Sequence, residues 1–99
     1  MALKAALITH SKTLSHHHGK EGIRVNTVCP GPIYIEGGAW EFVQNEMPDL
    51  YTNTLTQIPL GRMGDANEVA SLITFLASPV ASFMTGGNYV IDGGMCKGV

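Results

Sequence analysis

The chain has 99 residues, of which 44% are hydrophobic and 14% are charged, and its formal net charge is −2. This length suits one small domain, since domains typically run from about 50 to 250 residues. The six lysines and arginines are scattered, which argues against a nucleic-acid footprint. No apolar run approaches the roughly 20 residues of a membrane span, and the start lacks a signal-peptide pattern. We therefore expect a cytoplasmic protein that binds neither nucleic acid nor membrane.

The first expected element is a helix over residues 1–15. One face of this helix carries Leu3, Leu7, His10 and Leu14, which follow one another at helical spacing. No capping residue precedes this pattern, which is already complete at residue 1. A glycine turn at 19–22 separates the helix from an alternating, β-branched strand at 23–28. The prolines of 29–32 must end that strand, because proline cannot donate to a sheet ladder.

A glycine-containing loop is expected at 33–39, followed by a second helix at 40–51 with Pro48 as a kink or break. The third helix has the clearest signals. Asp65 can cap it, and Glu68 stands three residues later in capping-box position. Ser78 and Pro79 should end it, and a short final strand at 88–91 leads into the Asp92-Gly93-Gly94 turn.

This order of helix, strand, helical crossover and strand predicts an α/β architecture with parallel strands and a right-handed crossover. Parallel sheets are buried on both faces, and two strands make a poor one. We therefore expect the chain to form the edge of a larger sheet and to be incomplete on its own.

A metal site is not expected. His16, His17 and His18 are consecutive, and consecutive helix residues point about 100° apart, so their rings do not converge on one ion. Cys29 and Cys96 match no metal-ligand spacing, and without an export signal they are not expected to form a disulfide.

Eight short segments follow one another in a characteristic order along nearly the whole chain. They are KAAL at 4–7, GIRVN at 22–26, PGPI at 30–33, PLGR at 59–62, EVA at 68–70, FLAS at 75–78, TGG at 85–87 and IDGG at 91–94. Each is weak alone, but the ordered set resembles the C-terminal part of the classical short-chain dehydrogenase/reductase family. The resemblance implies a doubly wound, Rossmann-like parallel sheet. Residues 1–99 would be the C-terminal segment of one such domain, without its N-terminal dinucleotide-binding half.

The resemblance also implies an oxidoreductase that transfers hydride between NAD or NADP and a small carbonyl or alcohol. The family's catalytic pair is a tyrosine and, four residues later, a lysine, which share one helix face. Lys4 matches this lysine, which would favour the tyrosine phenolate and hold the nicotinamide ribose. The tyrosine would stand one position before Met1, and no glycine-rich phosphate loop occurs in the chain. The 99 residues alone are therefore expected to be inactive.

The remaining cofactor contacts implied by the family come from Pro30, Gly31, Pro32 and Ile33, at the carboxyl end of a strand where α/β sheets bind ligands. The backbone of Ile33 would meet the nicotinamide carboxamide. Ile35 replaces a threonine whose hydroxyl often contacts the cofactor. Residues 36–50 correspond to the segment that closes over substrate, and its apolar lining would be Trp40, Phe42 and Met47.

Other polar residues are expected to be structural. Asn26 would bridge backbone groups, and Asp92 would hold a turn. Arg62 would anchor its loop through an ion pair, with a phosphate contact as the alternative.

Two other interpretations of the whole chain remain open. It can be a non-catalytic interaction or oligomerisation module, since the family commonly forms homo-oligomers through the helix of Lys4 and the last strand. Alternatively, Met1 can be an internal methionine taken as a start codon.

Overall fold

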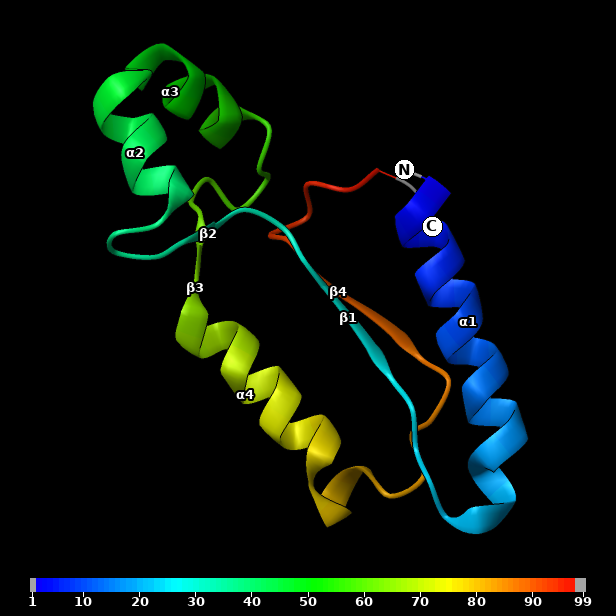
Figure 1. Cartoon of the computed structure of the whole chain (residues 1–99). Helices are drawn as coiled ribbons and strands as arrows, with labels where there is room; N and C mark the ends of the chain where they lie inside the picture. The colour runs from blue at the N-terminus through cyan, green and yellow to red at the C-terminus, as the bar shows by residue number, and fades with distance from the viewer. Residues whose placement is uncertain (1, 98–99) are drawn as a thin grey trace. The chain divides into compact units, whose positions relative to one another are not determined.

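The computed structural model describes residues 2–97 (Figure 1). In chain order the elements are α1 (Ala2–His18), η1 (Gly19–Glu21), β1 (Thr27–Pro30), β2 (Ile33–Tyr34), α2 (Ala39–Glu46), α3 (Pro48–Thr56), β3 (Gly64–Asp65), α4 (Ala66–Ala77), η2 (Pro79–Ala81) and β4 (Asn88–Ile91). They fall into two compact units. The first unit comprises Met1–Cys29 with Leu72–Tyr89, and the second comprises Pro30–Ser71 with Val90–Val99.

The strands form two small sheets. β1 pairs with β4, and β2 pairs with β3. The β2–β3 pair is parallel, with Ile33 opposite Gly64 and Tyr34 opposite Asp65. The predicted α/β class with parallel strands is therefore confirmed, and the predicted strand at 88–91 has the bounds of β4.

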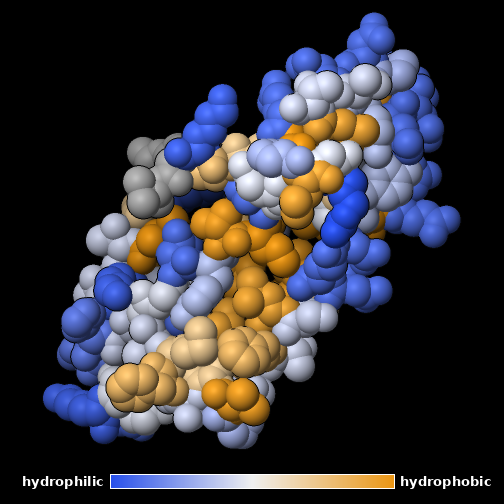
Figure 2. All heavy atoms as spheres, turned by 180° about the vertical axis from the view of Figure 1, so that it is seen from behind, coloured by the Kyte–Doolittle hydropathy of each residue, from blue (hydrophilic) through white to orange (hydrophobic). Residues whose placement is uncertain are grey.

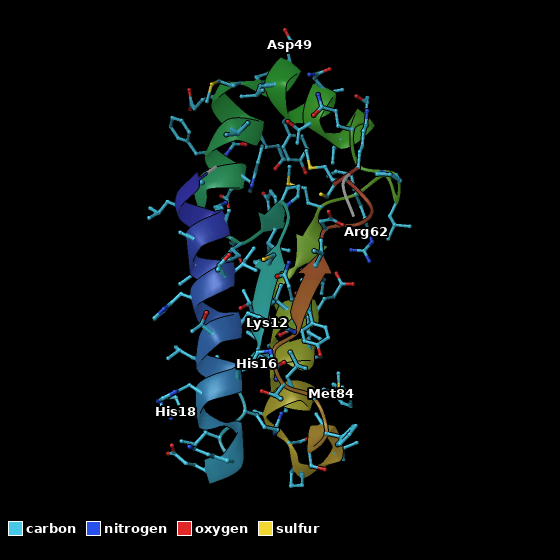
Figure 3. All side chains as sticks on the ribbon, turned by 90° about the vertical axis from the view of Figure 1, so that its right-hand side faces the viewer. Lys12, His16, His18, Asp49, Arg62 and Met84 are labelled. Atoms are coloured by element: carbon cyan, nitrogen blue, oxygen red, sulfur yellow. The ribbon has the colours of Figure 1, made fainter. Side chains whose placement is uncertain are left out.

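In the first unit, α1 extends three residues beyond its predicted end at residue 15 and ends at His18. No breaker occurs before Gly19, and Gly22 then adopts φ 77° and ends the following 3₁₀ turn. At this helix end the His17 and His18 rings lie edge to face, with their centroids 4.7 Å apart, whereas His16 lies elsewhere. Figure 3 shows His16 beside Lys12 on one side of α1 and His18 on another, where its Nδ1 lies 3.2 Å from Glu21 Oε1.

The predicted strand at 23–28 is wrong at both ends, because regular pairing begins only at Thr27 and continues through Pro30, two residues past the predicted end. The preceding residues bond to a loop instead. Val25 N donates to Thr85 Oγ1 at 3.1 Å. The Asn26 amide donates to the Met84 carbonyl at 2.9 Å and accepts from Gly87 N at 3.1 Å. These two bonds confirm the structural role expected of Asn26.

In the second unit, the helix predicted at 40–51 is two helices. The break lies at Met47, with φ −137° and ψ 63°, and Pro48 begins α3. Proline lacks the N–H of a continuous helix and its ring clashes with the preceding turn, so the break at Pro48 is the expected one. α3 continues to Thr56, beyond the predicted end.

The predicted loop at 33–39 is wrong at its start, since Ile33–Tyr34 forms β2. β-branched and aromatic residues favour strands, but two residues are too few to give an alternating pattern. Each of the two pairs with a residue of β3 that lies 31 positions later, and this strand was not predicted. Its last residue, Asp65, caps α4 (Ala66–Ala77) as expected: Asp65 Oδ1 accepts from Asn67 N at 2.8 Å, and Glu68 Oε1 accepts from Asp65 N at 2.9 Å.

Few apolar side chains are buried among the residues that the structure describes. They are Ile58, Met63, Leu76 and Ala81. Several large ones are exposed, and Figure 2 shows hydrophobic side chains gathered in orange on one face. Phe83 is 100% exposed and Leu3 is 80% exposed. Burying one such side chain stabilises by about 1.5–3 kcal/mol, so a partner surface that covered them would be favoured.

Candidate functional site

Lys4 lies in the first unit, near the start of α1, and its side chain is exposed. It contrasts with Lys12 two turns later, whose Nζ donates to the Gly86 carbonyl at 3.0 Å and lies toward the strands (Figure 3). The tyrosine partner expected for Lys4 would stand one position before Met1 and is not among the 99 residues. Lys4 thus presents an ammonium on a helix face where a side chain four residues earlier would be its neighbour.

The predicted cofactor loop lies in the second unit, between β1 and β2. It is held by hydrogen bonds on two sides. Gly31 N donates to the Ile91 carbonyl at 2.9 Å, at the end of β4, and the Pro32 carbonyl accepts from Gly64 N at 3.0 Å, in β3. Three segments far apart in the sequence, the loop itself, β3 and the end of β4, are therefore fixed to one another here.

The backbone of Ile33 has a defined direction. In a parallel ladder the N–H and C=O groups of successive residues point alternately to the two edges of the strand. Since the Pro32 carbonyl is bonded to Gly64 of β3, the N–H and C=O of Ile33 point to the opposite edge of β2. A donor and an acceptor side by side are what a carboxamide group needs for recognition.

Gly31 stands where no other residue fits. A Cβ at this position would lie 2.6 Å from Asp92 Cβ and 2.8 Å from Asp92 Cα. Its backbone therefore packs directly against the chain that follows β4.

Asp92 organises the turn on that side of the loop. Its Oδ1 accepts from Gly94 N at 2.9 Å and its Oδ2 accepts from Cys96 N at 2.8 Å. Gly93 and Gly94 have φ of 65° and 91°, which favours glycine at both positions. The Gly93 carbonyl in turn accepts from Leu60 N at 3.1 Å. Asp92 has the turn-holding role expected from the sequence.

Arg62 and Glu68 form a two-pronged ion pair on the other side. Arg62 Nη1 and Nη2 donate to Glu68 Oε1 and Oε2 at 2.9 and 3.0 Å. Hydrogen bonds from Arg62 and from Asp65 N lower the pKa of Glu68 to about 2, and the bond to Glu68 raises the pKa of Arg62. The expected ion pair of Arg62 is confirmed. Its partner was not predicted, although opposite charges six residues apart around Gly64 are a usable signal.

A cavity of about 90 Å³ lies among these groups, and its lining includes Pro32, Ile33, Arg62, Glu68 and Asp92. Pockets for drug-sized ligands are about 300–1,000 Å³, so this space is too small for a dinucleotide.

The residues expected to line the substrate pocket lie on α2 and at its end. Trp40 is half-buried, whereas Phe42 is 60% exposed and Met47 is 41% exposed. The sequence did not single out Tyr34, which anchors this segment: its hydroxyl donates to Gln44 Oε1 at 2.8 Å. Partial burial, helped by the nearby Glu41 carboxylate, raises the pKa of Tyr34.

Two absences apply to the residues that the structure describes. None of their helices is long and apolar enough to cross a membrane. Within the same range, no three histidine, cysteine, aspartate or glutamate side chains are grouped so that they could hold a metal ion.

Known proteins match this chain over most of its length. A family model described as enoyl-(acyl carrier protein) reductase matches residues 1–96. Isoepoxydon dehydrogenase patN of Aspergillus clavatus is 48% identical over 95 residues, which are 96% of this chain and 37% of that protein. The chain belongs to the short-chain dehydrogenase/reductase family.

Solved structures agree with this assignment. The NADPH-dependent reductase YwfH, involved in bacilysin biosynthesis, superimposes with a TM-score of 0.86 and 38% identity, over 96% of this chain and 38% of that one. A 4-hydroxyisoleucine dehydrogenase complexed with NADH gives 0.83 and 35%, over 99% and 39%. The chain thus matches the C-terminal part of Rossmann-fold structures and spans little more than a third of its relatives' length.

Proposed function

We propose that this chain supplies the C-terminal part of a single-domain, NAD(P)-dependent oxidoreductase that acts on a small carbonyl or alcohol. The observation that carries the proposal is the outward N–H and C=O of Ile33, at a loop that follows a strand of a dehydrogenase-family fold. Relatives that use NADPH and NADH are both known, so either cofactor is compatible. Pro30, Gly31 and Pro32 shape the loop, and Ile33 contacts the carboxamide.

Lys4 is the proposed catalytic side chain. A tyrosine has an ordinary pKa near 10 and is a poor base at neutral pH. A lysine cation four residues later on the same helix face favours the phenolate, which can then exchange a proton with the substrate oxygen. The exposed ammonium of Lys4 is available for this role and for the ribose hydroxyls of the cofactor. When bound, the nicotinamide ring supplies or accepts the hydride.

The proposed substrate segment runs through α2, where Trp40, Phe42 and Met47 provide apolar surface. Exposed side chains of this kind favour closure over a small organic molecule, because closure removes apolar area from water. Steady-state kinetics with a panel of alcohols and ketones of increasing apolar size would test this preference.

A chimera tests the proposal. The part of isoepoxydon dehydrogenase patN that precedes the matched 95 residues is fused to this chain, and NAD(P)-dependent turnover is measured with that relative's own substrate and with simple ketones and alcohols. We expect turnover by the chimera and none by the 99 residues alone, because they include neither the tyrosine nor the phosphate loop. A folded chimera that binds no cofactor, or turnover by the 99 residues alone, would contradict the proposal.

A second candidate function is a non-catalytic oligomerisation module. The specific observation in its favour is the exposed apolar face of α1, where Leu3 and Leu7 are 80% and 60% exposed and lie one turn apart. Light scattering during size-exclusion chromatography distinguishes such a module from a part that cannot fold by itself. A folded homo-oligomer of the 99 residues supports the module, and an aggregated or unfolded chain argues against it.

Cytoplasmic location and independence from metal remain predictions. Cell fractionation tests the first, and activity of the chimera after chelation tests the second.

A further inference from the structure

The loop that presents Ile33 depends on β3, which has only two residues. Gly64 of β3 donates to the Pro32 carbonyl at 3.0 Å, and this bond sets the edge to which Ile33 turns its backbone. The fit is close, because a Cβ on Gly64 would lie 2.6 Å from Ile33 Cδ1. A two-residue strand has too few ladder bonds to fix itself, so the groups that hold β3 decide how Ile33 is presented.

Glu68 holds β3 directly at Asp65 and, through Arg62, at the residue before Gly64. Its Oε1 accepts from Asp65 N at 2.9 Å, and its two oxygens accept from the Arg62 guanidinium at 2.9 and 3.0 Å. Arg62 Nη1 also donates to the Met63 carbonyl at 3.0 Å. One carboxylate thereby fixes the residues on either side of Gly64.

The Arg62–Glu68 ion pair contributes little to the free energy of unfolding. The Arg62 and Glu68 side chains are 59% and 44% exposed, and exposed ion pairs are typically worth little. The Arg62–Glu68 pair matters more for local geometry than for stability, because planar two-pronged pairs fix orientation as well as distance. The role that fits both facts is local positioning of the backbone.

We propose that Glu68 is a positioning residue for the cofactor: through Arg62 and Asp65 it fixes β3, and through the bond from Gly64 to Pro32 it orients the Ile33 backbone toward the nicotinamide carboxamide. This inference rests on the proposed function. It adds a residue that touches neither cofactor nor substrate and governs cofactor affinity.

The experiment uses the chimera with Glu68→Ala and Glu68→Gln. We expect Glu68→Ala to raise KM for the cofactor about 10-fold with kcat changed less than about 3-fold, since loss of charge-assisted bonds that orient a binding group is worth about a decade. Glu68→Gln keeps one acceptor oxygen for Asp65 N and should raise KM by about 3-fold. The melting temperature should change by no more than a few degrees.

The matched control is Glu21→Ala in the first unit. Glu21 is 51% exposed, and its Oε1 likewise makes a short side-chain contact, 3.2 Å from His18 Nδ1, within the first unit. Its kinetic constants should equal those of the parent chimera.

Amide hydrogen exchange gives a second readout that does not require activity. Exchange at Gly64 N should accelerate about 10-fold or more in Glu68→Ala and remain unchanged in Glu21→Ala, because local opening becomes easier only where the bond network is broken. Unchanged Gly64 exchange would overturn the inference even in an inactive chimera. An unchanged cofactor KM with reduced kcat or reduced melting temperature would also overturn it. An inactive parent chimera in which Gly64 exchange responds as expected would instead contradict the proposed function.

Discussion

The two compact units present their proposed functional groups in different ways. In the first unit Lys4 is an exposed side chain whose position follows from the helix that carries it. In the second unit the proposed group is the backbone of Ile33, oriented by bonds that join β2 to β3 and the preceding loop to β4. A side-chain function of this kind depends only on the helix that carries the residue. A backbone function depends on several segments, distant in the sequence, all taking their correct positions. The two regions should therefore fail differently when altered.

The largest effect is expected at Lys4. Lys4→Ala in the chimera should lower kcat by about 100-fold or more, because the tyrosine loses the cation that favours its ionised form. Initial rates at saturating cofactor measure this. Lys20→Ala changes an exposed lysine of η1 and should leave kcat unchanged. Equal rates for Lys4→Ala and the parent would remove Lys4 from the chemistry.

Gly31→Ala should be the most damaging change in the second unit. The added methyl would lie 2.8 Å from the Asp92 backbone, and overpacking of this kind costs about 1–3 kcal/mol. We expect a lower urea midpoint and weaker cofactor binding by fluorescence titration. Gly19→Ala meets nothing within 4 Å and serves as the control, with a change below about 1 kcal/mol. A Gly31→Ala chimera as stable as the control would show that the Asp92 contact can relax.

Low pH should weaken the hydrogen bonds by which the Glu68 carboxylate holds β3. The folded-state pKa of Glu68 is about 2, below its ordinary value of 4.5. A lowered pKa means that the carboxylate's contribution is fully present above about pH 4.5 and is lost as pH falls toward 2. The small difference in urea midpoint between parent and Glu68→Gln should therefore shrink over this range, and high salt should also reduce it. A difference that stays constant from pH 4.5 to 2 would contradict the assignment.

The smallest effect is expected at Ile35, next to β2 and 53% exposed. Ile35→Thr supplies the hydroxyl common in the family, and one added hydrogen bond is worth about 0.5–1.5 kcal/mol. KM for the cofactor should fall about 2- to 10-fold. Ile35→Val keeps the branched shape without the hydroxyl and should leave KM unchanged. If Ile35→Val also lowered the cofactor KM, the smaller side chain and not the hydroxyl would explain the tighter binding.

The sequence predicted the features that local signals determine. Asp65 and Glu68 mark the start of α4 through capping chemistry, and Pro48 marks the break between α2 and α3. The proposal of Lys4 as the catalytic side chain rests on the same kind of local signal, its helix pattern and the family segment around it, and its role stays a prediction. Each of these depends on residues within a few positions of one another.

The features that escaped prediction depend on distant partners. β2 has two residues, and nothing near Ile33 indicates that Gly64 will pair with it. The predicted strand at 23–28 was too long because Val25 bonds to the Thr85 side chain, 60 residues away. Likewise, Glu68 was assigned only to a helix cap, since its bonds to Arg62 require the chain to turn at Gly64.

The most direct test of this account is one set of cofactor-saturation curves for the parent chimera, Lys4→Ala and Glu68→Ala. We expect a reduced kcat for Lys4→Ala and a raised cofactor KM with nearly unchanged kcat for Glu68→Ala. If both variants lose kcat alone, or if neither differs from the parent, the distinction between a side-chain site at Lys4 and a positioned backbone site at Ile33 is wrong.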